Sequence, residues 1–294
     1  MSQVWLITGS SRGFGKALAE AVLEAGHSLI ATARNPAQLD GLVQRYGQRV
    51  RAVAMDVTDA TAAHAAIQAA VDAFGRLDVV VNNAGYGNMA SIEEGDDADF
   101  RAQLETNLFG VVNVTRAALP VLRKQGAGHI IQFSSIGGRI GVPGLAAYQA
   151  AKWAVEGFSE VLAKEVATFG IHVTLIEPGG FRTDWAGPSM TVHTPAADSA
   201  YAPMLGQMIE MMQAHAGNET GDPVKAAQAI LTIAQQPQPP LRLLLGSDAV
   251  HLAEQQAAKM AAEDAKWRTL SLSTDYDSTP ETVETRRRLL ESLG

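Results

Sequence analysis

Thr8-Gly9-Ser10-Ser11-Arg12-Gly13-Phe14-Gly15 follows the apolar run Val4-Trp5-Leu6-Ile7 near the beginning of the chain. Glycine lets the backbone approach a ligand closely, and the free N–H groups at the start of a helix carry partial positive charge. A glycine-rich turn between a strand and a helix is therefore the context in which the phosphates of a dinucleotide bind. The spacing here is Gly-x-x-x-Gly-x-Gly, which differs from the Gly-x-Gly-x-x-Gly of the commonest dinucleotide binders.

Short apolar runs alternate with longer alanine-rich stretches on either side of this turn, which is the pattern of βαβ units. The predicted strands are Val4–Thr8, Ser28–Ala33, Val50–Met55, Val79–Asn82, His129–Ser134, His172–Glu177 and Leu241–Leu245. Helices are predicted near residues 14–25, 37–46, 60–74, 97–125 and 148–168. We therefore expect an α/β fold, a single doubly wound Rossmann-type domain whose central parallel sheet of about seven strands is flanked by helices.

The composition excludes several functional classes. A chain of 294 residues with 47% hydrophobic content can bury a core as one domain. The net charge of −8 argues against a nucleic-acid partner, because such proteins concentrate positive charge on one face. The chain has no cysteine, which removes disulfides, thiolate nucleophiles and cysteine-ligated zinc. Its seven histidines show no His-x-x-x-His spacing, so no metal site is expected.

The amino-terminal apolar run is four residues long and no basic segment precedes it, so we expect no secretory signal. No apolar run approaches the roughly 20 residues that span a bilayer. We expect a cytoplasmic protein with no membrane partner.

A second stretch, Ala147-Tyr148-Gln149-Ala150-Ala151-Lys152-Trp153, carries groups suited to acid/base chemistry. A phenol with a pKa of about 10 exchanges protons poorly at neutral pH unless a cation stabilises its phenolate. Four residues make about one helical turn, so the ammonium of Lys152 lies on the same face as the phenol of Tyr148. Each motif alone occurs by chance, but a nucleotide-binding turn, then Ser135, then Tyr-x-x-x-Lys predicts a complete redox site.

In this order the motifs resemble those of the short-chain dehydrogenase/reductase family over roughly residues 3–183. The matching segments are Thr8 to Gly15, Asp56-Val57, Asn82-Asn83-Ala84-Gly85, Asn107, Ser135, Tyr148, Lys152, Pro178-Gly179 and Thr183. The resemblance implies that Tyr148 exchanges the proton and that Lys152 lowers its pKa and holds the nicotinamide ribose. It also implies that Ser135 binds the substrate oxygen and that Asn107 completes a proton relay through water.

The resemblance further implies a cofactor site, in which Asp56 holds the adenine and Thr183 contacts the nicotinamide carboxamide. The segment Asn82 to Gly85 would brace the sheet beside the adenosine ribose. The whole implied set of cofactor-binding residues is Gly9, Ser11, Arg12, Gly13, Phe14, Gly15, Arg34, Asp56, Val57, Asn83, Ala84, Gly85, Tyr148, Lys152, Pro178, Gly179 and Thr183.

The end of the second predicted strand distinguishes the two nicotinamide cofactors. A carboxylate there would bind a free ribose 2′-hydroxyl, whereas an arginine pairs with a 2′-phosphate. Ala33 stands where an NAD binder would carry aspartate, and Arg34 follows it, with Arg12 as a second nearby cation. The alternative is that both arginines are ordinary surface charges. Because the carboxylate is missing, we expect NADP(H).

Two of the proposed catalytic residues have structural alternatives. Ser134 competes with Ser135, but neighbouring residues at a strand end point in opposite directions. The family places its serine about a dozen residues before the tyrosine, which favours Ser135. Asn107 could instead be a helix-kinking or capping amide.

The alternation of strands and helices breaks after Pro178-Gly179-Gly180. Residues 185–222 combine turn residues with five methionines, at positions 190, 204, 208, 211 and 212. A methionine stripe suits core packing, but flexible thioethers also suit an adaptable apolar pocket. We expect a substrate lid here, after a cofactor-binding and catalytic core in 1–183, and a capping helical extension in 246–294 within one domain, 1–294.

The expected function is an NADP(H)-dependent oxidoreductase that interconverts a carbonyl and an alcohol of an apolar small molecule, most simply as a ketone or aldehyde reductase. The resemblance is strongest to the hydroxysteroid and retinol dehydrogenase branch. Enoyl reduction is disfavoured, because related enoyl reductases space their tyrosine and lysine more widely. The alternative is a catalytically silent NADP(H)-binding sensor. Helices near 107–125 and 148–168 are expected to form a homodimer or homotetramer unless the tail covers them.

Overall fold

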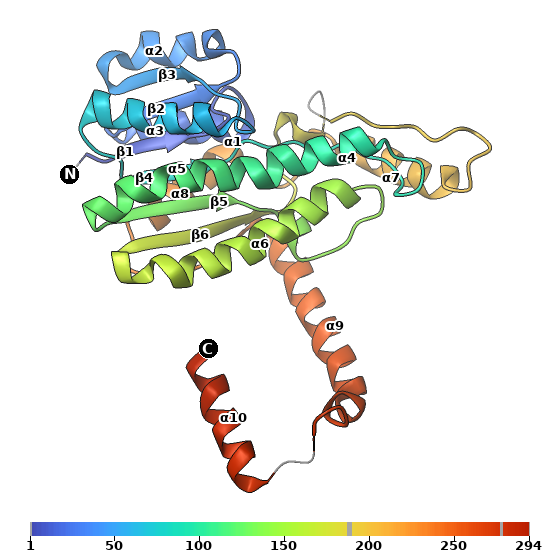
Figure 1. Ribbon diagram of the computed structural model, residues 1–294. Coiled ribbons are helices and arrows are strands. Elements are labelled where there is room, and N and C mark those ends of the chain that lie inside the picture. Colours follow the sequence, from blue (N-terminus) through green and yellow to red (C-terminus); the bar gives the residue numbers. More distant parts are fainter. Residues whose placement is uncertain (1, 187–189, 277–278, 294) are drawn as a thin grey trace. The chain divides into compact units, whose positions relative to one another are not determined.

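A computed structural model describes residues 2–186, 190–276 and 279–293 of the chain (Figure 1). Its centre is a seven-stranded sheet in the order β3-β2-β1-β4-β5-β6-β7, in which each neighbouring pair is parallel. The strands are β1 Val4–Ile7, β2 Ser28–Ala33, β3 Val50–Ala54, β4 Val79–Asn82, β5 Gly128–Phe133, β6 Ile171–Pro178 and β7 Arg242–Leu245. The predicted doubly wound α/β fold is confirmed.

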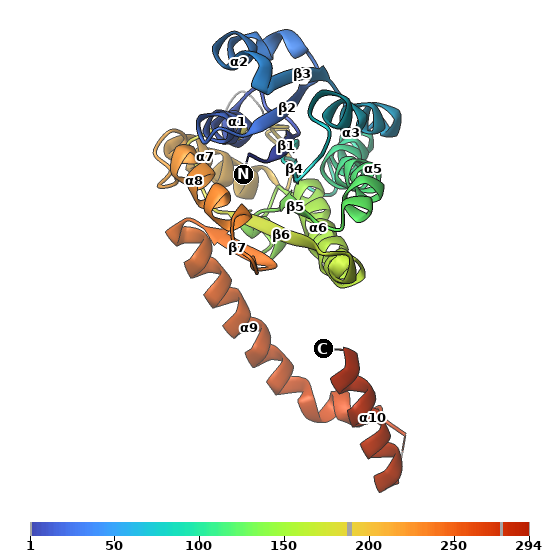
Figure 2. The same cartoon turned by 90° about the vertical axis from the view of Figure 1, so that its left-hand side faces the viewer.

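Helices cover both faces of the sheet (Figure 2). On one face lie α1 (Gly13–Glu24) and α8 (Pro223–Ala234), and on the other lie α3 (Ala60–Phe74), α5 (Gly110–Gln125) and α6 (Ala146–Val166). Each face of the sheet has its own cluster of buried apolar side chains. Trp5 and Ile7 of β1 belong to the cluster beneath α1 and α8, and Val4 and Leu6 belong to the cluster beneath α3, α5 and α6. Strand residues point alternately to opposite faces, so an unbroken apolar run is what a sheet covered on both faces needs.

The helical stretch predicted for residues 97–125 contains a change of helix type. It consists of α4 (Asp97–Leu104), a π-helical turn Glu105–Phe109, and α5. Short π-helical turns inside longer helices are frequent at functional sites. Asn107 lies within this turn and is fully buried.

The segment after β6 contains a 3₁₀ turn (Asp184–Ala186) and α7 (Ala202–His215). A small apolar cluster has Met89, Leu145 and Leu205 at its centre. Further apolar side chains pack against that cluster, among them Met190, Met204, Met208, Met212 and Trp185. Met211 is exposed. Most of these methionines therefore have a packing role, while residues 187–189 of the predicted lid lie outside the described part of the chain.

The carboxyl-terminal part divides from the rest between Ala253 and Glu254, within α9 (Ser247–Leu272). Residues Glu254–Gly294 form a unit of their own that also contains α10 (Pro280–Leu293). Within α10, Arg287 pairs with Glu284 at 2.8 Å and with Glu291. Exposed pairs of this kind add little stability. In the described ranges, no helix is long and apolar enough to cross a membrane.

Candidate active site

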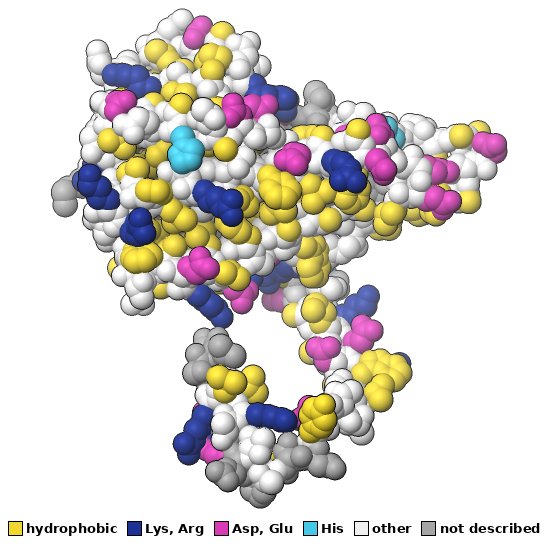
Figure 3. All heavy atoms as spheres, in the orientation of Figure 1, with side chains coloured by type: hydrophobic (Ala, Val, Ile, Leu, Met, Phe, Trp, Pro, Cys, Tyr) yellow, Lys and Arg dark blue, Asp and Glu magenta, His cyan; other side chains and the backbone are white. Residues whose placement is uncertain are grey.

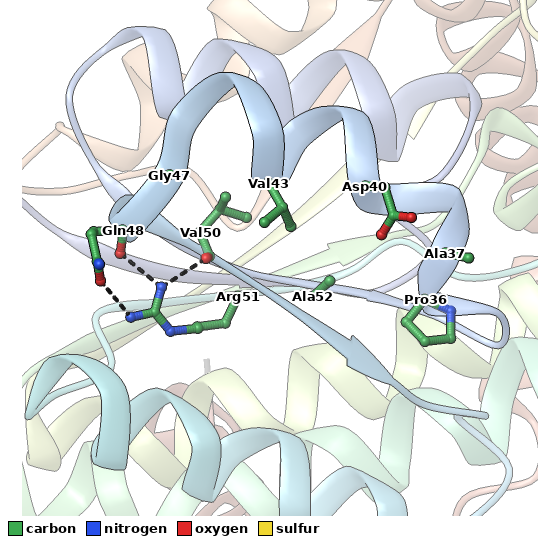
Figure 4. Close-up of a pocket in the computed structure, with 9 residues that line it drawn as sticks. All are labelled: Pro36, Ala37, Asp40, Val43, Gly47, Gln48, Val50, Arg51 and Ala52. Atoms are coloured by element: carbon green, nitrogen blue, oxygen red, sulfur yellow. Dashed lines mark hydrogen bonds between the residues drawn. The ribbon is translucent and has the colours of Figure 1, made fainter.

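The described part of the α/β unit contains at least two hollows, and the predicted site residues line one of them. A groove of about 750 Å³ lies against the outer edge of β3 (Figure 4). It is lined by Pro36, Ala37, Asp40, Val43, Gly47, Gln48, Val50, Arg51 and Ala52. Its most prominent cation, Arg51, donates to the Gln48 and Val50 carbonyl oxygens, at 3.0 Å each. The groove is mostly apolar and contains none of the predicted motifs.

The second hollow is a cavity of about 850 Å³ at the carboxyl ends of the strands. Its lining includes Gly9 after β1, Arg34 after β2, Asn83 after β4 and Gly179 after β6. Ligands of open α/β sheets bind at this edge. Of the predicted catalytic and cofactor-binding residues, the lining omits only Gly15 and Asn107, which are buried.

The glycine turn is held in place by the end of β4. Thr8 Oγ1 accepts hydrogen bonds from the backbone N–H groups of Asn83 and Ala84, at 2.9 Å each. The Asn83 side chain donates in return to the Thr8 and Gly9 carbonyl oxygens, at 2.9 and 3.2 Å. A Cβ atom on Gly15 would lie 2.2 Å from the Gly9 carbonyl oxygen. Glycine is therefore required at position 15 for the turn to close.

Tyr148 and Ser135 meet inside the cavity. The Tyr148 side chain is 8% exposed, and its hydroxyl makes a side-chain hydrogen bond with Ser135. Burial raises the pKa of Tyr148 to about 12, and the Ser135 bond opposes this only in part. The resemblance led us to expect a lowered pKa, but burial outweighs the Ser135 hydrogen bond, which lowers it. The phenol is therefore a protonated donor at neutral pH.

Lys152 lies one helical turn further along α6, and its ammonium is buried. Its Nζ donates to the Phe133 carbonyl oxygen at 2.6 Å and lies 5.6 Å from the centre of the Tyr148 ring. Burial lowers the pKa of Lys152 to about 8, and the nearby Glu156 carboxylate counteracts part of that shift. At neutral pH this leaves a cation beside the phenol.

A buried charged cluster lies behind Lys152. The Glu177 carboxylate is fully buried and accepts two hydrogen bonds from Arg139, at 2.8 and 2.7 Å. Burial raises the pKa of Glu177 to about 7, although the Arg139 bond counteracts it. Arg242 pairs with Glu156 at 2.9 Å. Among the described residues, Glu156 is the carboxylate that raises the pKa of Lys152. Arg242 compensates the negative charge of Glu156 within this cluster.

The structure distinguishes the two neighbouring serines. Ser135 Oγ accepts from the Gly137 N–H at 3.0 Å and bonds Tyr148. Ser134 Oγ is buried and has no hydrogen-bond partner among the described residues. A Cβ atom on Gly138 would lie 2.7 Å from it. The geometry therefore favours Ser135 as the serine that acts with Tyr148.

Asn107 lies one layer behind the cavity, where its side-chain amide pairs with a loop. It accepts from the Tyr86 N–H at 3.0 Å and donates to the Tyr86 carbonyl oxygen at 2.8 Å. It also donates to the Gln103 carbonyl oxygen at 2.8 Å. The side chain therefore has a structural role, and the relay implied by the family resemblance stays a prediction.

The two arginines predicted to bind a ribose 2′-phosphate are exposed at the cavity. Arg12, Arg34 and Ala33 all contribute to the lining. Neither guanidinium makes an ion pair with a carboxylate in the part of the chain that the structure describes. Both cations are therefore available to an anionic ligand.

The cavity also contains residues that were not predicted individually. Trp185 packs against Tyr148, with ring centroids 5.1 Å apart and an interplanar angle of 54°. Asn88, Thr191 and His215 line the same space, as does Met212, one of the five methionines singled out in the sequence. Trp185 begins the predicted lid, so its position beside Thr183 was the available signal. The others converge only through the tertiary fold.

Comparison with known proteins identifies the family. Residues 3–191 match the family model of the short chain dehydrogenases. Oxidoreductase BOA17 of Botryotinia fuckeliana is 54% identical over 275 residues, which cover 93% of this chain and 100% of that protein. A short-chain dehydrogenase structure from Streptomyces avermitilis is 39% identical with a TM-score of 0.85, covering 94% of this chain and 100% of that chain. Another from Burkholderia cenocepacia, solved in complex with NADP, is 26% identical with a TM-score of 0.71, covering 90% and 97%. The chain therefore belongs to the short-chain dehydrogenase/reductase family of oxidoreductases.

Proposed function

We propose that the protein is an NADP(H)-dependent reductase of aldehydes or ketones carried by apolar small molecules. The observation that carries the proposal is a buried Tyr148, bonded to Ser135 and one helical turn from Lys152, in the cavity that begins at the glycine turn. A phenol, a hydroxyl and an ammonium grouped in this way suit proton donation to a substrate oxygen that is becoming an alkoxide.

The nicotinamide, when bound, supplies a hydride to the carbonyl carbon. Ser135 and Tyr148 hold the carbonyl oxygen by hydrogen bonds, and Tyr148 donates its proton to that oxygen as the alcohol forms. The resulting phenolate is stabilised by the Lys152 ammonium, because a nearby cation favours the charged form of an acid. Hydride and proton together convert the carbonyl into the alcohol, and Tyr148 regains a proton from solvent before the next cycle.

The glycine turn fits the dinucleotide. The backbone has left-handed φ angles of +67° at Gly9 and +52° at Gly13, which glycine adopts without strain. The helix start offers N–H groups to a pyrophosphate. Arg12 and Arg34, with Ala33 in place of a carboxylate, support a ribose 2′-phosphate and hence NADP(H). The NADP complex of the Burkholderia relative supports the same choice.

The remaining part of the cavity supports an apolar substrate. Ile140, Val142, Leu145, Trp185 and Met212 line it around Tyr148. Sites for small organic molecules combine such apolar walls with a few polar groups that orient the ligand. The reacting oxygen would be oriented by Ser135 and Tyr148, and the apolar remainder of the substrate by these walls.

The proposal includes a cytoplasmic homodimer or homotetramer. Hydrophobic side chains gather on the face formed by α4, α5 and α6 (Figure 3). Phe109, Trp153 and Val161 are 46%, 46% and 58% exposed there. An apolar patch of this kind supports subunit pairing through these helices. Light scattering at micromolar concentration measures the assembly state.

The test of the proposed function is NADPH oxidation with decanal, benzaldehyde and acetophenone, followed by nicotinamide absorbance, with NADH in parallel. We expect turnover with at least one carbonyl and higher kcat/KM with NADPH. No turnover above a protein-free blank with a broad panel of aldehydes and ketones, by protein that binds NADPH, would favour a sensor instead.

A further inference from the structure

The loop between β4 and α4 contains a short strap, residues 86–90, that lies against the catalytic tyrosine. A Cβ atom on Gly87 would lie 3.2 Å from the Tyr148 ring and 3.1 Å from Trp185. The strap backbone is therefore in close contact with both aromatic side chains. Any displacement of the strap changes the space in which the Tyr148 ring and its hydroxyl lie.

On its other side the strap pairs with the segment that follows the 3₁₀ turn. Met89 N–H donates to the Thr191 carbonyl oxygen at 2.9 Å, and His193 N–H donates to the Met89 carbonyl oxygen at 2.8 Å. Thr191 N–H donates to Asn88 Oδ1 at 2.9 Å. Residues 191–193 are thus held to the strap by three hydrogen bonds, and one of them depends on the Asn88 side chain.

The Asn88 side chain is held in turn by α4. Its Nδ2 donates to Asp99 Oδ1 at 2.6 Å, and its backbone N–H donates to Gln103 Oε1 at 2.9 Å. Gln103 Nε2 donates to the other oxygen of the Asp99 carboxylate at 2.8 Å. Asn88 and Gln103 are 9% and 2% exposed. Charge-assisted bonds in such a closed, mostly buried ring are stronger and better oriented than isolated surface bonds.

The same turn of α4 also holds Asn107. Gln103 accepts from Asn107 Nδ2 through its carbonyl oxygen, while its side chain holds Asn88. Asn107 in turn pairs with both backbone groups of Tyr86, the first residue of the strap. One continuous set of hydrogen bonds therefore connects residues 191–193, the strap and the residue implied in the proton relay.

We propose that Asn88, Asp99 and Gln103 are positioning residues that fix residues 191–193 over the cavity and the strap against Tyr148. They would set the affinity for the carbonyl substrate through the placement of this segment. The consequence for turnover rests on the proposed function, whereas the consequence for residues 191–193 does not.

The network lies apart from the two large clusters that hold the helices on the sheet. None of its three members belongs to those clusters or to any strand. The apolar support of the strap and of residues 191–193 is the small cluster around Met89, against which Val192 packs. Segments supported mainly by such a small cluster open locally, at a lower free energy than the whole domain. Breaking the network is therefore expected to loosen residues 191–193 before it unfolds the sheet.

The test exploits an exchange of chemical groups. Asn88→Asp places two carboxylates face to face, and Asp99→Asn leaves one amide donor facing another. Together the two substitutions restore every hydrogen bond of the ring, whereas the contact of His193 Nε2 with the Asp99 carboxylate, at 3.8 Å, is lost in Asp99→Asn and in the double variant alike. The new carboxylate at position 88 still accepts from the Thr191 N–H, and the new amide at position 99 can donate to that carboxylate and accept from Gln103. Asp97→Asn, exposed in the same first turn of α4, is the matched control.

Hydrogen exchange of peptides that cover Thr191 and His193 is measured first, in the protein with NADP alone. We expect hydrogen exchange in these peptides to be at least about tenfold faster in each single variant than in the natural protein. In the double variant, Asn88→Asp with Asp99→Asn, it should return to the natural rate, and exchange in the sheet should not change in any variant. In turnover of decanal, KM for decanal should rise at least about tenfold in the single variants. KM for NADPH should remain within twofold of the natural value in the single variants. In Asp97→Asn, both KM values should remain within twofold of those of the natural protein.

Hydrogen exchange at residues 191–193 that is unchanged in both single variants overturns the proposal. A double variant that folds but recovers neither the slow hydrogen exchange nor the natural KM for decanal also overturns it. If a single variant does not fold, Thr191→Pro removes the N–H that donates to Asn88 and leaves the bonds among Asn88, Asp99 and Gln103 in place. Unchanged KM for decanal in that variant would also overturn the proposal. Hydrogen exchange is measured without substrate. Absence of turnover would therefore reject the proposed function, while the exchange measurement would still test the role of Asn88, Asp99 and Gln103.

Discussion

The Nζ atom of Lys152 lies 5.6 Å from the centre of the Tyr148 ring, and both side chains are buried. The same burial has opposite effects on the two acids. It raises the pKa of Tyr148 to about 12 and lowers that of Lys152 to about 8, since each shift disfavours the charged form. Lys152 is thus the group of this pair that titrates closer to neutral pH.

The first prediction concerns the pH dependence of reduction. We expect kcat/KM to fall as pH rises through about 8, where Lys152 loses its charge, while Tyr148 stays protonated. The contribution of Lys152 to the free energy of unfolding should instead rise with pH over this range. Its folded-state pKa lies below the ordinary 10.5, so the unfolded state binds more protons between those values and stability rises with pH. A pH–rate profile and parallel denaturant titrations measure both.

A profile that stays flat from about pH 7 to about pH 10 would contradict the need for a charged Lys152. Lys152→Met provides the control, because it removes the titrating group and should abolish both pH effects while lowering the rate at every pH.

Closure of the glycine turn is tested by two alanine substitutions. Gly15→Ala places a Cβ atom 2.2 Å from the Gly9 carbonyl oxygen, so we expect a loss of at least about 1–3 kcal/mol in the free energy of unfolding, and weaker NADPH binding. Gly41→Ala in α2 (Asp40–Tyr46) meets no atom within 4 Å and should instead stabilise by about 0.5–1 kcal/mol. Denaturant unfolding and NADPH titration of both variants provide the comparison. Equal stability of the two would mean that the turn does not need glycine at position 15.

Much of the fold could be predicted from sequence because its signals are local. The alternating apolar runs, the turn Thr8 to Gly15 and the spacing of Tyr148 and Lys152 each lie within a few residues. The π-helical turn could not be predicted, since Glu105-Thr106-Asn107-Leu108-Phe109 contains neither proline nor glycine. It is a place where tertiary contacts, here the pairing of Asn107 with Tyr86, override local preference.

The polar network was equally invisible in the sequence. Asn88, Asp99, Gln103 and Thr191 have no shared motif, and polar residues at such separations are typical of loops and helix surfaces. Only the fold brings them within hydrogen-bond distance. The pKa of Tyr148 has the same explanation, because the spacing to Lys152 is local whereas the burial that dominates the shift is not.

Cofactor preference is tested at Arg34. Removing a charge-assisted hydrogen bond costs on the order of 1.5–3 kcal/mol, which corresponds to about 10- to 150-fold in affinity. We expect Arg34→Ala to weaken NADPH binding by that factor and to leave NADH binding nearly unchanged. Arg45→Ala on α2, where the arginine forms an exposed pair with Glu24, is the control. Equal or better efficiency with NADH in the natural protein would mean that Arg12 and Arg34 are only surface charges.

The role of the methionines is tested by a pair on one helix. Met212 lines the cavity, whereas Met208 packs against the neighbouring apolar cluster without contributing to the lining. We therefore expect Met212→Ala to change the relative kcat/KM of decanal and benzaldehyde, and Met208→Ala to act mainly on the melting temperature. The opposite assignment of effects would show that the wall of the substrate pocket lies elsewhere.

The most direct test of the account is the steady-state rate of Tyr148→Phe with NADPH and the best carbonyl of the panel. The substitution removes the proton-donating oxygen and keeps the ring, so we expect kcat to fall by about 10²–10⁴-fold. NADPH affinity and the melting temperature should stay close to those of the natural protein. Tyr46→Phe, which removes an exposed hydroxyl bonded to Glu24, should keep full activity. A Tyr148→Phe variant that retains more than about a tenth of the natural kcat would contradict the role of Tyr148 as the proton donor.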